Sequence, residues 1–229
     1  MESFVFLPPA RATAAISGIA ERFPIHRIYC VGRNFVEHAK EMGAEAPKEK
    51  PVFFMKPADA VSQSSLIPYP SQTNDLHHEV ELVVALGPNI PEQLTTENAD
   101  QAIFAYAIGL DLTRRDLQAQ AKEKRLPWDT AKGFDASAPI SHLILKEHAH
   151  ITAQTQLSLT VNGQLRQQAN LGEMIFSVPD ILIELSKLYR LKAGDLIFMG
   201  TPAGVAALQK GDTFIATLEG VVSFSASIF

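Results

Sequence analysis

Two glutamates separated by one residue are the most informative feature of the sequence. Glu79 and Glu81 begin an apolar stretch, residues 82–86, that has the pattern of a β-strand. Side chains alternate between the two faces of a strand, so both carboxylates lie on one face, about 7 Å apart along it. Adjacent carboxylates repel each other unless a cation lies between them. The pair indicates a cation site, and the alternative is a strand with one solvent-exposed face.

A third carboxylate strengthens the metal hypothesis. Asp111 follows the apolar run 105–110 at the end of another predicted strand. Three oxygen ligands without a cysteine suit a hard cation such as Mg²⁺, whereas the alternative for Asp111 is a turn residue or a helix cap. A zinc-protease site is excluded, because His-Glu-x-x-His would need a histidine where Leu82 stands. The adjacent His77 and His78 face opposite sides of a strand and do not easily share a metal.

Other side chains could supply acid–base chemistry or bind anions. His38 and Glu41 are three residues apart on a predicted helix, where a carboxylate can orient a histidine that acts as a general base. Arg115 and Gln118 share one helix face after the third carboxylate, and Lys132 lies between small and aromatic neighbours. The alternatives are an exposed helical ion pair for the first two and solvated surface residues for the other three.

The segment from Gly200 to Val205 is not a phosphate loop, because it lacks the glycine–lysine end of that motif. Its structural interpretation is a turn between strands. Its functional interpretation is a loop in which the Thr201 hydroxyl and backbone amides meet a carboxylate. Cys30 and Trp128 are predicted to belong to the core rather than to the chemistry.

The elements that must position these side chains are mostly strands with three or four short helices. Asn34 is a candidate N-cap and Gly43 a candidate C′ glycine for a helix over residues 35–42. Thr113 and Asp116 resemble a capping box that opens a helix ending near residue 125. Ser177 and Asp180 resemble another. The other predicted elements are strands at 27–31, 52–55, 79–86 and 103–110, a mobile loop at 44–51, a hairpin at 157–161 and 164–168 around Asn162-Gly163, and strand-rich segments at 195–199 and 212–228.

Length and composition restrict the class of protein. The 229 residues are 46% hydrophobic and 20% charged, which excludes wholesale disorder. The net charge of −5 is spread along the chain, which argues against a nucleic-acid partner. A single cysteine favours a reducing compartment. With no predicted secretion signal or membrane span, we expect a cytoplasmic protein.

Several stretches together resemble the fumarylacetoacetate hydrolase family, in its short acylpyruvase and fumarylpyruvate hydrolase branch. They occur in the family's order from about residue 27 to the end of the chain. The similar stretches are residues 29–38, 54–57, 74–82, 109–118, 126–128, 131–132, 174–177 and 200–202. No single motif is decisive, but their joint occurrence is very specific.

The resemblance implies a role for each matching residue. Glu79, Glu81 and Asp111 would bind Mg²⁺ or Mn²⁺. His38 with Glu41 would activate water, and Lys132 would support the oxyanion. The weaker oxyanion candidates are Arg115 and Gln118, and the residues that would hold the substrate's carboxylate and carbonyl groups are Arg33, Lys56 and Thr201.

The resemblance also implies a mixed α/β, mostly β fold with a β-roll or β-sandwich-like core, short peripheral helices and a homodimeric assembly. Residues 27–229 would be a single catalytic domain, and residues 1–26 a leader packed on it. The loop after the His38 helix would act as a lid. Phe35 stands where many relatives carry tyrosine, so a role for that hydroxyl is not expected here.

The implied reaction is metal-dependent hydrolysis of the carbon–carbon bond of an acylpyruvate. Fumarylpyruvate, from the gentisate route of aromatic degradation, is the favoured substrate, and fumarate and pyruvate are the products. The closest alternative is an oxaloacetate decarboxylase or keto–enol tautomerase, which uses the same enolate chemistry and needs no attacking water. A sugar-acid dehydratase and a non-catalytic metal- or sugar-binding β-sandwich are the remaining alternatives.

Overall fold

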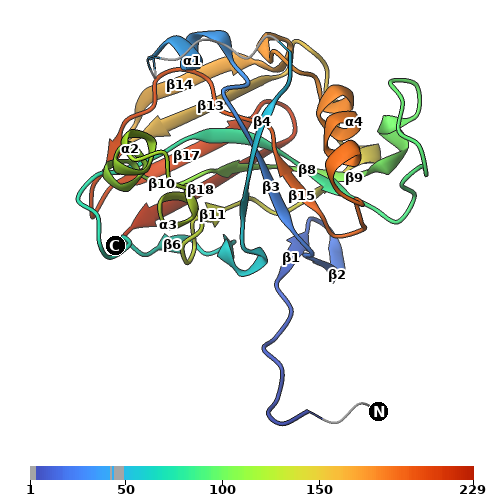
Figure 1. The fold of residues 1–229 in the computed structure, drawn as a ribbon, viewed down its shortest axis with the longest axis horizontal. Coiled ribbons are helices and arrows are strands. Elements are labelled where there is room, and N and C mark those ends of the chain that lie inside the picture. Colours follow the sequence, from blue (N-terminus) through green and yellow to red (C-terminus); the bar gives the residue numbers. More distant parts are fainter. Residues whose placement is uncertain (1–3, 42, 44–48) are drawn as a thin grey trace.

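Two β-sheets form most of the molecule, and short helices lie at its periphery (Figure 1). The computed structural model describes residues 4–41, 43 and 49–229. The first sheet has the strand order β12 (Ile144–Leu145), β9 (Ile103–Leu110), β8 (Val80–Leu86), β15 (Leu196–Phe198), β3 (Ile28–Gly32) and β4 (Val52–Lys56). The second has the order β14 (Gln164–Asn170), β13 (Gln156–Val161), β17 (Thr213–Leu218), β18 (Val222–Ile228) and β6 (Leu66–Ile67). The predicted mostly β fold with short helices is confirmed.

Smaller elements connect and cover the sheets. The smaller strands are β1 (Thr13–Ile16) with β2 (Ile19–Pro24), β10 (Thr113–Arg114) with β7 (Leu76–His77) and β16 (Ala207–Leu208), and β11 (Ala138–Pro139) with β5 (Val61–Ser62). The α-helices are α1 (Val36–Glu41), α2 (Arg115–Glu123), α3 (Asp129–Lys132) and α4 (Val178–Leu188). The 3₁₀-helices are η1 (Ala58–Ala60), η2 (Ala99–Ala102), η3 (Lys146–His148) and η4 (Leu171–Glu173).

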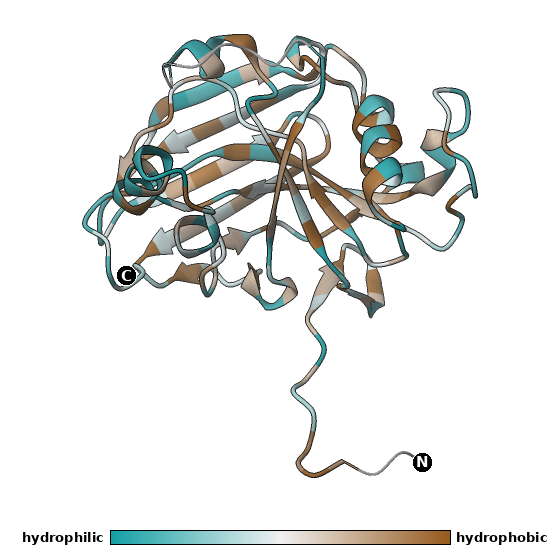
Figure 2. Ribbon diagram, in the orientation of Figure 1, coloured by the Kyte–Doolittle hydropathy of each residue, from teal (hydrophilic) through white to brown (hydrophobic). Residues whose placement is uncertain are grey.

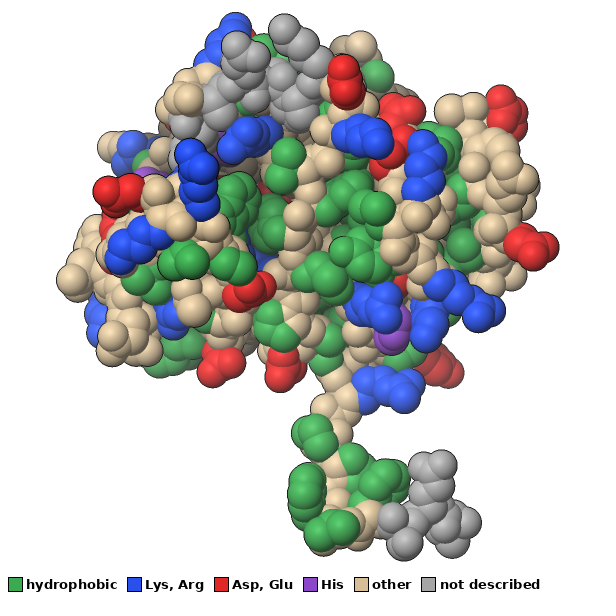
Figure 3. Space-filling model, in the orientation of Figure 1, with side chains coloured by type: hydrophobic (Ala, Val, Ile, Leu, Met, Phe, Trp, Pro, Cys, Tyr) green, Lys and Arg blue, Asp and Glu red, His purple; other side chains and the backbone are tan. Residues whose placement is uncertain are grey.

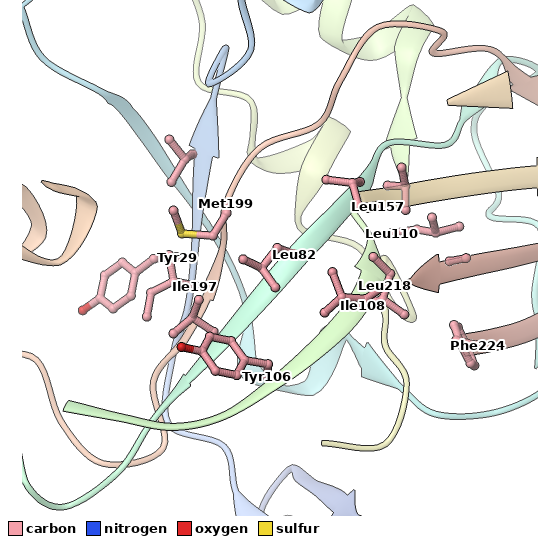
Figure 4. Packing of buried hydrophobic residues seen from close by; sticks show 14 of the residues in the cluster. Tyr29, Leu82, Tyr106, Ile108, Leu110, Leu157, Ile197, Met199, Leu218 and Phe224 are labelled. Carbon is pink, nitrogen blue, oxygen red and sulfur yellow. The ribbon is translucent and has the colours of Figure 1, made fainter. Parts of the chain in front are cut away.

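The hydrophobic core lies on both faces of the six-stranded sheet. Between the two sheets, Leu82 and Ile108 pack with Leu157 and Leu218 (Figure 4). On the opposite face, Val83 belongs to a second cluster that includes residues of the β1–β2 hairpin. Each such leucine or isoleucine contributes about 1.5–3 kcal/mol by its burial. Brown apolar segments accordingly line the strands in Figure 2, and every residue of β8 is buried.

Two local signals in the sequence are confirmed. Asn162 and Gly163 have φ angles of 52° and 75°, as the type I′ turn of the β13–β14 hairpin requires. Ser177 accepts a hydrogen bond from the backbone N–H of Asp180, and the Asp180 side chain accepts one from the backbone N–H of Ser177. This reciprocal pair is a capping box that starts α4.

Two predicted helix caps are wrong. Thr113 belongs to β10, α2 begins at Arg115 without a side-chain cap, and Asp116 accepts a hydrogen bond from the Thr73 hydroxyl at 2.7 Å. Asn34 is fully buried, and its side-chain amide donates to the carbonyls of Phe176 and Met199. In both cases a long-range hydrogen bond replaces the local one that the pattern indicated.

The β1–β2 hairpin packs on the second apolar cluster, whereas residues 4–11 extend away from the body (Figure 1). The boundary between a leader (1–26) and a catalytic domain (27–229) stays a prediction. Most of the predicted mobile loop, and with it the proposed lid, lies outside the described residues. None of the helices in the described part of the chain combines the length and hydropathy that crossing a membrane requires.

Candidate metal centre and active site

Strand pairing brings the three predicted metal ligands together. Glu79 precedes β8, and Asp111 follows β9, which pairs antiparallel with β8. The backbone N–H of Asp111 donates to the carbonyl of Glu79 at 2.9 Å. One carboxylate oxygen from each of Glu79, Glu81 and Asp111 lies within 4.8 Å of the others, and all three residues are buried. The shared face expected for the two glutamates is confirmed.

A glycine that follows β15 holds Glu81 in place. The backbone N–H of Gly200 donates to Glu81 Oε2 at 2.7 Å. Gly200 has a φ angle of +94°, and a Cβ atom there would lie 2.7 Å from the Cβ of Asn34. Only glycine fits this combination of a left-handed backbone and a close approach. The segment therefore supports a metal ligand, in addition to placing Thr201.

Two buried lysines balance the carboxylates. Lys132, in α3, lies 2.9 Å from Glu79 and 2.6 Å from Asp111, and donates to the Thr113 hydroxyl at 2.6 Å. Lys56, at the end of β4, lies 2.8 Å from Asp111 and is fully buried. Its ammonium also donates to backbone carbonyls of residues 112 and 132. Lys56 therefore supports Asp111 from behind, which does not agree with its predicted contact with substrate.

The cluster perturbs the pKa values of its own members. Burial and then the nearby carboxylates of Asp111 and Glu79 raise the pKa of Glu81 well above its usual range. Burial alone would raise the pKa of Glu79 too, but the cations of Lys132 and Arg115 outweigh it and lower that pKa. Likewise, burial opposes the charge of Lys132, yet Asp111 and Glu79 raise its pKa. The repulsion among the three carboxylates is thus greatest at Glu81.

These residues fit a divalent cation. The donors are all carboxylate oxygens, which Mg²⁺ and Mn²⁺ prefer, and no cysteine or histidine of the described chain joins the cluster. A cation between the oxygens would relieve the repulsion that raises the pKa of Glu81. Glu79, Glu81 and Asp111 would hold it.

A histidine–glutamate pair lies beside this cluster. In α1, His38 Nδ1 is 3.3 Å from Glu41 Oε2, and the other oxygen of Glu41 accepts the backbone N–H of Gly204 at 3.0 Å. Burial lowers the pKa of His38, although the charges of Glu79 and Glu41 oppose that shift. The lowered pKa favours the neutral imidazole, which is able to accept a proton. The loop after β15 thus holds the Glu41 carboxylate, which in turn orients His38.

A cavity of about 30 Å³ joins the two groups. It is lined by Val31, Gly32, Arg33, His38, Phe54, Glu79, Glu81, Arg115, Gln118, Lys122, Trp128, Lys132 and Thr201. Every predicted site residue except Glu41, Lys56 and Asp111 lines it. The assignment of Trp128 to the core is wrong, because its half-buried ring forms part of the wall together with Phe54.

The remaining predicted residues lie on different elements around this cavity. Arg115 donates to Glu79 at 2.5 Å and to the side-chain oxygen of Gln118 at 2.6 Å, so α2 presents them together. Arg33 follows β3 with a φ angle of +61°, an uncommon conformation that directs the chain into α1. Thr201 follows Gly200 and is buried.

The sequence analysis missed Gln167, a buried residue of β14 that connects three segments. Its amide nitrogen donates to the Thr201 hydroxyl and to the carbonyl of Pro202, both at 2.8 Å. Its side-chain oxygen accepts from the backbone N–H of Val80 at 3.1 Å and lies 2.8 Å from His78 Nδ1. A glutamine in an otherwise polar hairpin strand has no local signal of such a role. Only the burial pattern of the fold reveals it.

Comparisons with known proteins identify the relatives of this chain. A model described as fumarylacetoacetate (FAA) hydrolase C-terminal matches residues 27–228. A solved fumarylpyruvate hydrolase from Pseudomonas aeruginosa, in complex with Mn²⁺ and pyruvate, is similar with a TM-score of 0.92 and 40% identity over 99% of both chains. Oxaloacetate tautomerase YcgM from Escherichia coli (strain K12) is 42% identical over 200 residues, 86% of this chain and 90% of the relative. The mitochondrial oxaloacetate tautomerase FAHD1 of Bos taurus is 42% identical over 197 residues, 86% and 88% of the two chains.

Proposed function

Because the chain belongs to the fumarylacetoacetate hydrolase family, we propose that it hydrolyses the carbon–carbon bond of an acylpyruvate, with fumarylpyruvate as the favoured substrate and fumarate and pyruvate as products. The observation that carries the proposal is one cavity lined both by Glu79 and Glu81 of the three-carboxylate cluster and by His38, which contacts Glu41. The likeness over nearly the whole chain to a fumarylpyruvate hydrolase supports the choice of reaction.

The proposed cofactor is Mg²⁺ or Mn²⁺, held by Glu79, Glu81 and Asp111. When bound, the cation supplies a Lewis acid that stabilises negative charge on the oxygens of the keto acid. The pair Arg115–Gln118 lies beside Glu79, where it can orient these oxygens. Arg33 and Thr201, on the opposite loops, provide a cation and a hydroxyl for the carboxylate of the pyruvoyl end.

His38 activates the water. Its Nδ1 faces Glu41, so Nε2 is the nitrogen that accepts the proton while Glu41 stabilises the charged ring. The water oxygen adds to the carbonyl of the acyl group, and the bond to the methylene carbon then breaks. The acyl group leaves as fumarate, and pyruvate leaves as its enolate and takes up a proton.

Lys132 can donate to the oxyanion only at the expense of a present contact. Its ammonium has three N–H donors, and each is directed at one oxygen of Glu79, Asp111 or Thr113. A single donor to an oxyanion is commonly worth about 3 kcal/mol. Lys132 therefore has to exchange one of its carboxylate contacts for the substrate oxygen during the reaction.

Oxaloacetate tautomerisation is the second candidate function. Two relatives at 42% identity carry that name. Tautomerisation or decarboxylation of oxaloacetate uses the same stabilised enolate but consumes no water, so it depends less on the His38–Glu41 pair. The homodimer and the cytoplasmic location remain predictions.

The deciding experiment follows fumarylpyruvate and oxaloacetate with chelator-treated protein, with and without added Mg²⁺ or Mn²⁺. Metal-dependent release of fumarate and pyruvate, much faster than any change in oxaloacetate, supports the hydrolase. Metal-dependent conversion of oxaloacetate with intact fumarylpyruvate supports the second candidate.

The base is tested by His38→Ala, with Glu37→Gln on the exposed side of α1 as the matched control. We expect hydrolysis to fall by about 10²–10³-fold in the first variant, because a general base is lost, and to stay unchanged in the second. A His38→Ala rate within a few-fold of the parent would show that another group activates the water.

A further inference from the structure

The carboxylate cluster needs no further cation from the protein. Glu79 and Asp111 are paired with three cationic side chains, and Glu81 accepts the backbone N–H of Gly200 instead. The ion pairs are Lys56–Asp111 at 2.8 Å, Arg115–Glu79 at 2.5 Å, Lys132–Glu79 at 2.9 Å and Lys132–Asp111 at 2.6 Å. Any other positive charge on the cavity wall is therefore available to a ligand.

Two such charges are present. Arg33 and Lys122 both line the cavity. In the described part of the chain, neither forms an ion pair with a carboxylate. Burial and then the nearby positive charges of Arg115 and Arg33 lower the pKa of Lys122, as expected where cations outnumber anions. Figure 3 shows Lys and Arg side chains gathered on this face over α2.

An aromatic wall separates Lys122 from the cluster. The Lys132 ammonium lies 5.0 Å from the centre of the Phe54 ring, and the Phe54 and Trp128 rings are 5.8 Å apart. Lys122 lies 5.5 Å from the centre of the Trp128 ring and is exposed at the cavity rim. The wall thus runs from a buried ammonium, past two rings, to a second ammonium at the rim.

We propose that Lys122 binds a carboxylate at the far end of the acyl group, and that Phe54 and Trp128 contact the planar chain between it and the reacting carbonyl. This inference rests on the proposed function and narrows its substrate class to acylpyruvates with a second, terminal carboxylate. A flat unsaturated chain packs well against aromatic rings, and an anion at its end meets the cation at the rim. A short neutral acyl group reaches neither Lys122 nor the whole wall.

The test compares two substrates in one variant pair. Fumarylpyruvate carries the terminal carboxylate, and acetylpyruvate has a neutral methyl in its place. For Lys122→Met we expect KM for fumarylpyruvate to rise about tenfold with kcat little changed, because a charge-assisted contact made in both ground and transition states is lost. For acetylpyruvate, kcat/KM should change less than threefold. Lys122→Arg should restore most of the fumarylpyruvate KM.

The matched control is Lys124→Met, which removes an exposed lysine two residues further along and should leave both substrates unchanged. Raising the ionic strength should raise KM for fumarylpyruvate in the parent more than in Lys122→Met. Equal losses on both substrates, or no loss on either, would overturn the assignment of Lys122 to the terminal carboxylate.

A binding measurement separates this inference from the reaction itself. Trp128 is the only tryptophan of the chain, so its fluorescence reports ligand at the wall. In a His38→Ala background with Mg²⁺, fumarylpyruvate should quench it, and adding Lys122→Met should weaken that binding about tenfold. If the parent hydrolyses neither acylpyruvate, the proposed function fails, while this titration still decides the Lys122 contact. No change in fluorescence with fumarylpyruvate would contradict the proposed contact with the wall.

Discussion

The two ends of the cavity are built in opposite ways. At the carboxylate end, Glu79, Glu81 and Asp111 are at most 5% exposed and are held by ion pairs or by a backbone N–H. At the rim, Lys122 is exposed, Trp128 is half-buried, and the lysine ammonium lies over the tryptophan ring. The side chains of the buried end are therefore held in one arrangement, as a metal site requires. Side chains at the rim can be substituted without loss of stability, so the rim is suited to determine specificity for the acyl group.

The largest effect is expected at the buried end, from Glu81→Gln. The amide removes one negative ligand, so we expect kcat for the metal-loaded enzyme to fall about 10³-fold, with weaker metal binding measured by calorimetry. Without metal, the free energy of unfolding should not fall, because the pKa of Glu81 is already raised and its neutral form favoured. The control Glu219→Gln removes an exposed carboxylate. Unchanged metal affinity in Glu81→Gln would remove it from the ligand set.

Lys56→Met tests whether the buried end depends on exact charge pairing for its stability. Both Lys56 and Asp111 side chains are fully buried, so the variant removes one of the two ammonium partners of a buried carboxylate and leaves only Lys132. We expect a loss of about 3–5 kcal/mol in the free energy of unfolding in chelator, measured by urea denaturation. Lys40→Met breaks an exposed pair with Glu37 and should cost less than about 1 kcal/mol. Similar losses in the two variants would show that burial makes no difference.

His78, which contacts the Gln167 side chain, provides a pH test of the hydrogen bonds that hold Thr201. Burial lowers its pKa to about 4, below the ordinary value of 6.5. Between pH 6.5 and about pH 4, His78 therefore binds a proton in the unfolded chain but not in the folded chain. The free energy of unfolding falls as the pH drops through this range, by about 3 kcal/mol in total. Urea denaturation from pH 7 to pH 4 should show a smaller slope in His78→Gln. Parallel curves for the two proteins would contradict the shift.

The smallest effect is expected at the rim, from Trp128→Leu. Loss of the ring should raise KM for fumarylpyruvate about threefold to tenfold and leave kcat within about twofold, because the wall contributes packing and takes no part in the chemistry. Trp128→Phe should recover part of the loss. Stability should be unaffected in thermal unfolding. A kcat loss comparable to that of Glu81→Gln would abolish the distinction between the two ends.

What the sequence could predict followed from local patterns. Alternation along β8 put Glu79 and Glu81 on one face, the Asn162-Gly163 pair marked a hairpin, and Ser177 marked the start of α4. Each of these depends on residues close together in the chain, where backbone geometry alone decides.

The failures come from contacts between distant segments. The pattern at Thr113 matched a helix cap, but its hydroxyl is used by the Lys132 ammonium. Asn34 bonds to residues 142 and 165 positions away, and Gln167 bonds to His78 across 89 positions. Lysine usually lies on the surface, but Lys56 is buried in an ion pair with Asp111. Such side-chain partners have no local signature, because the fold brings them together only after the strands have paired.

The three contacts of the Lys132 ammonium have a consequence for the protein in the absence of metal. Since ammonium groups of the protein already offset Glu79 and Asp111, we expect the chain to fold without a metal, unlike a zinc finger. Chelation should then switch off catalysis and leave a folded protein that regains activity when an ion returns.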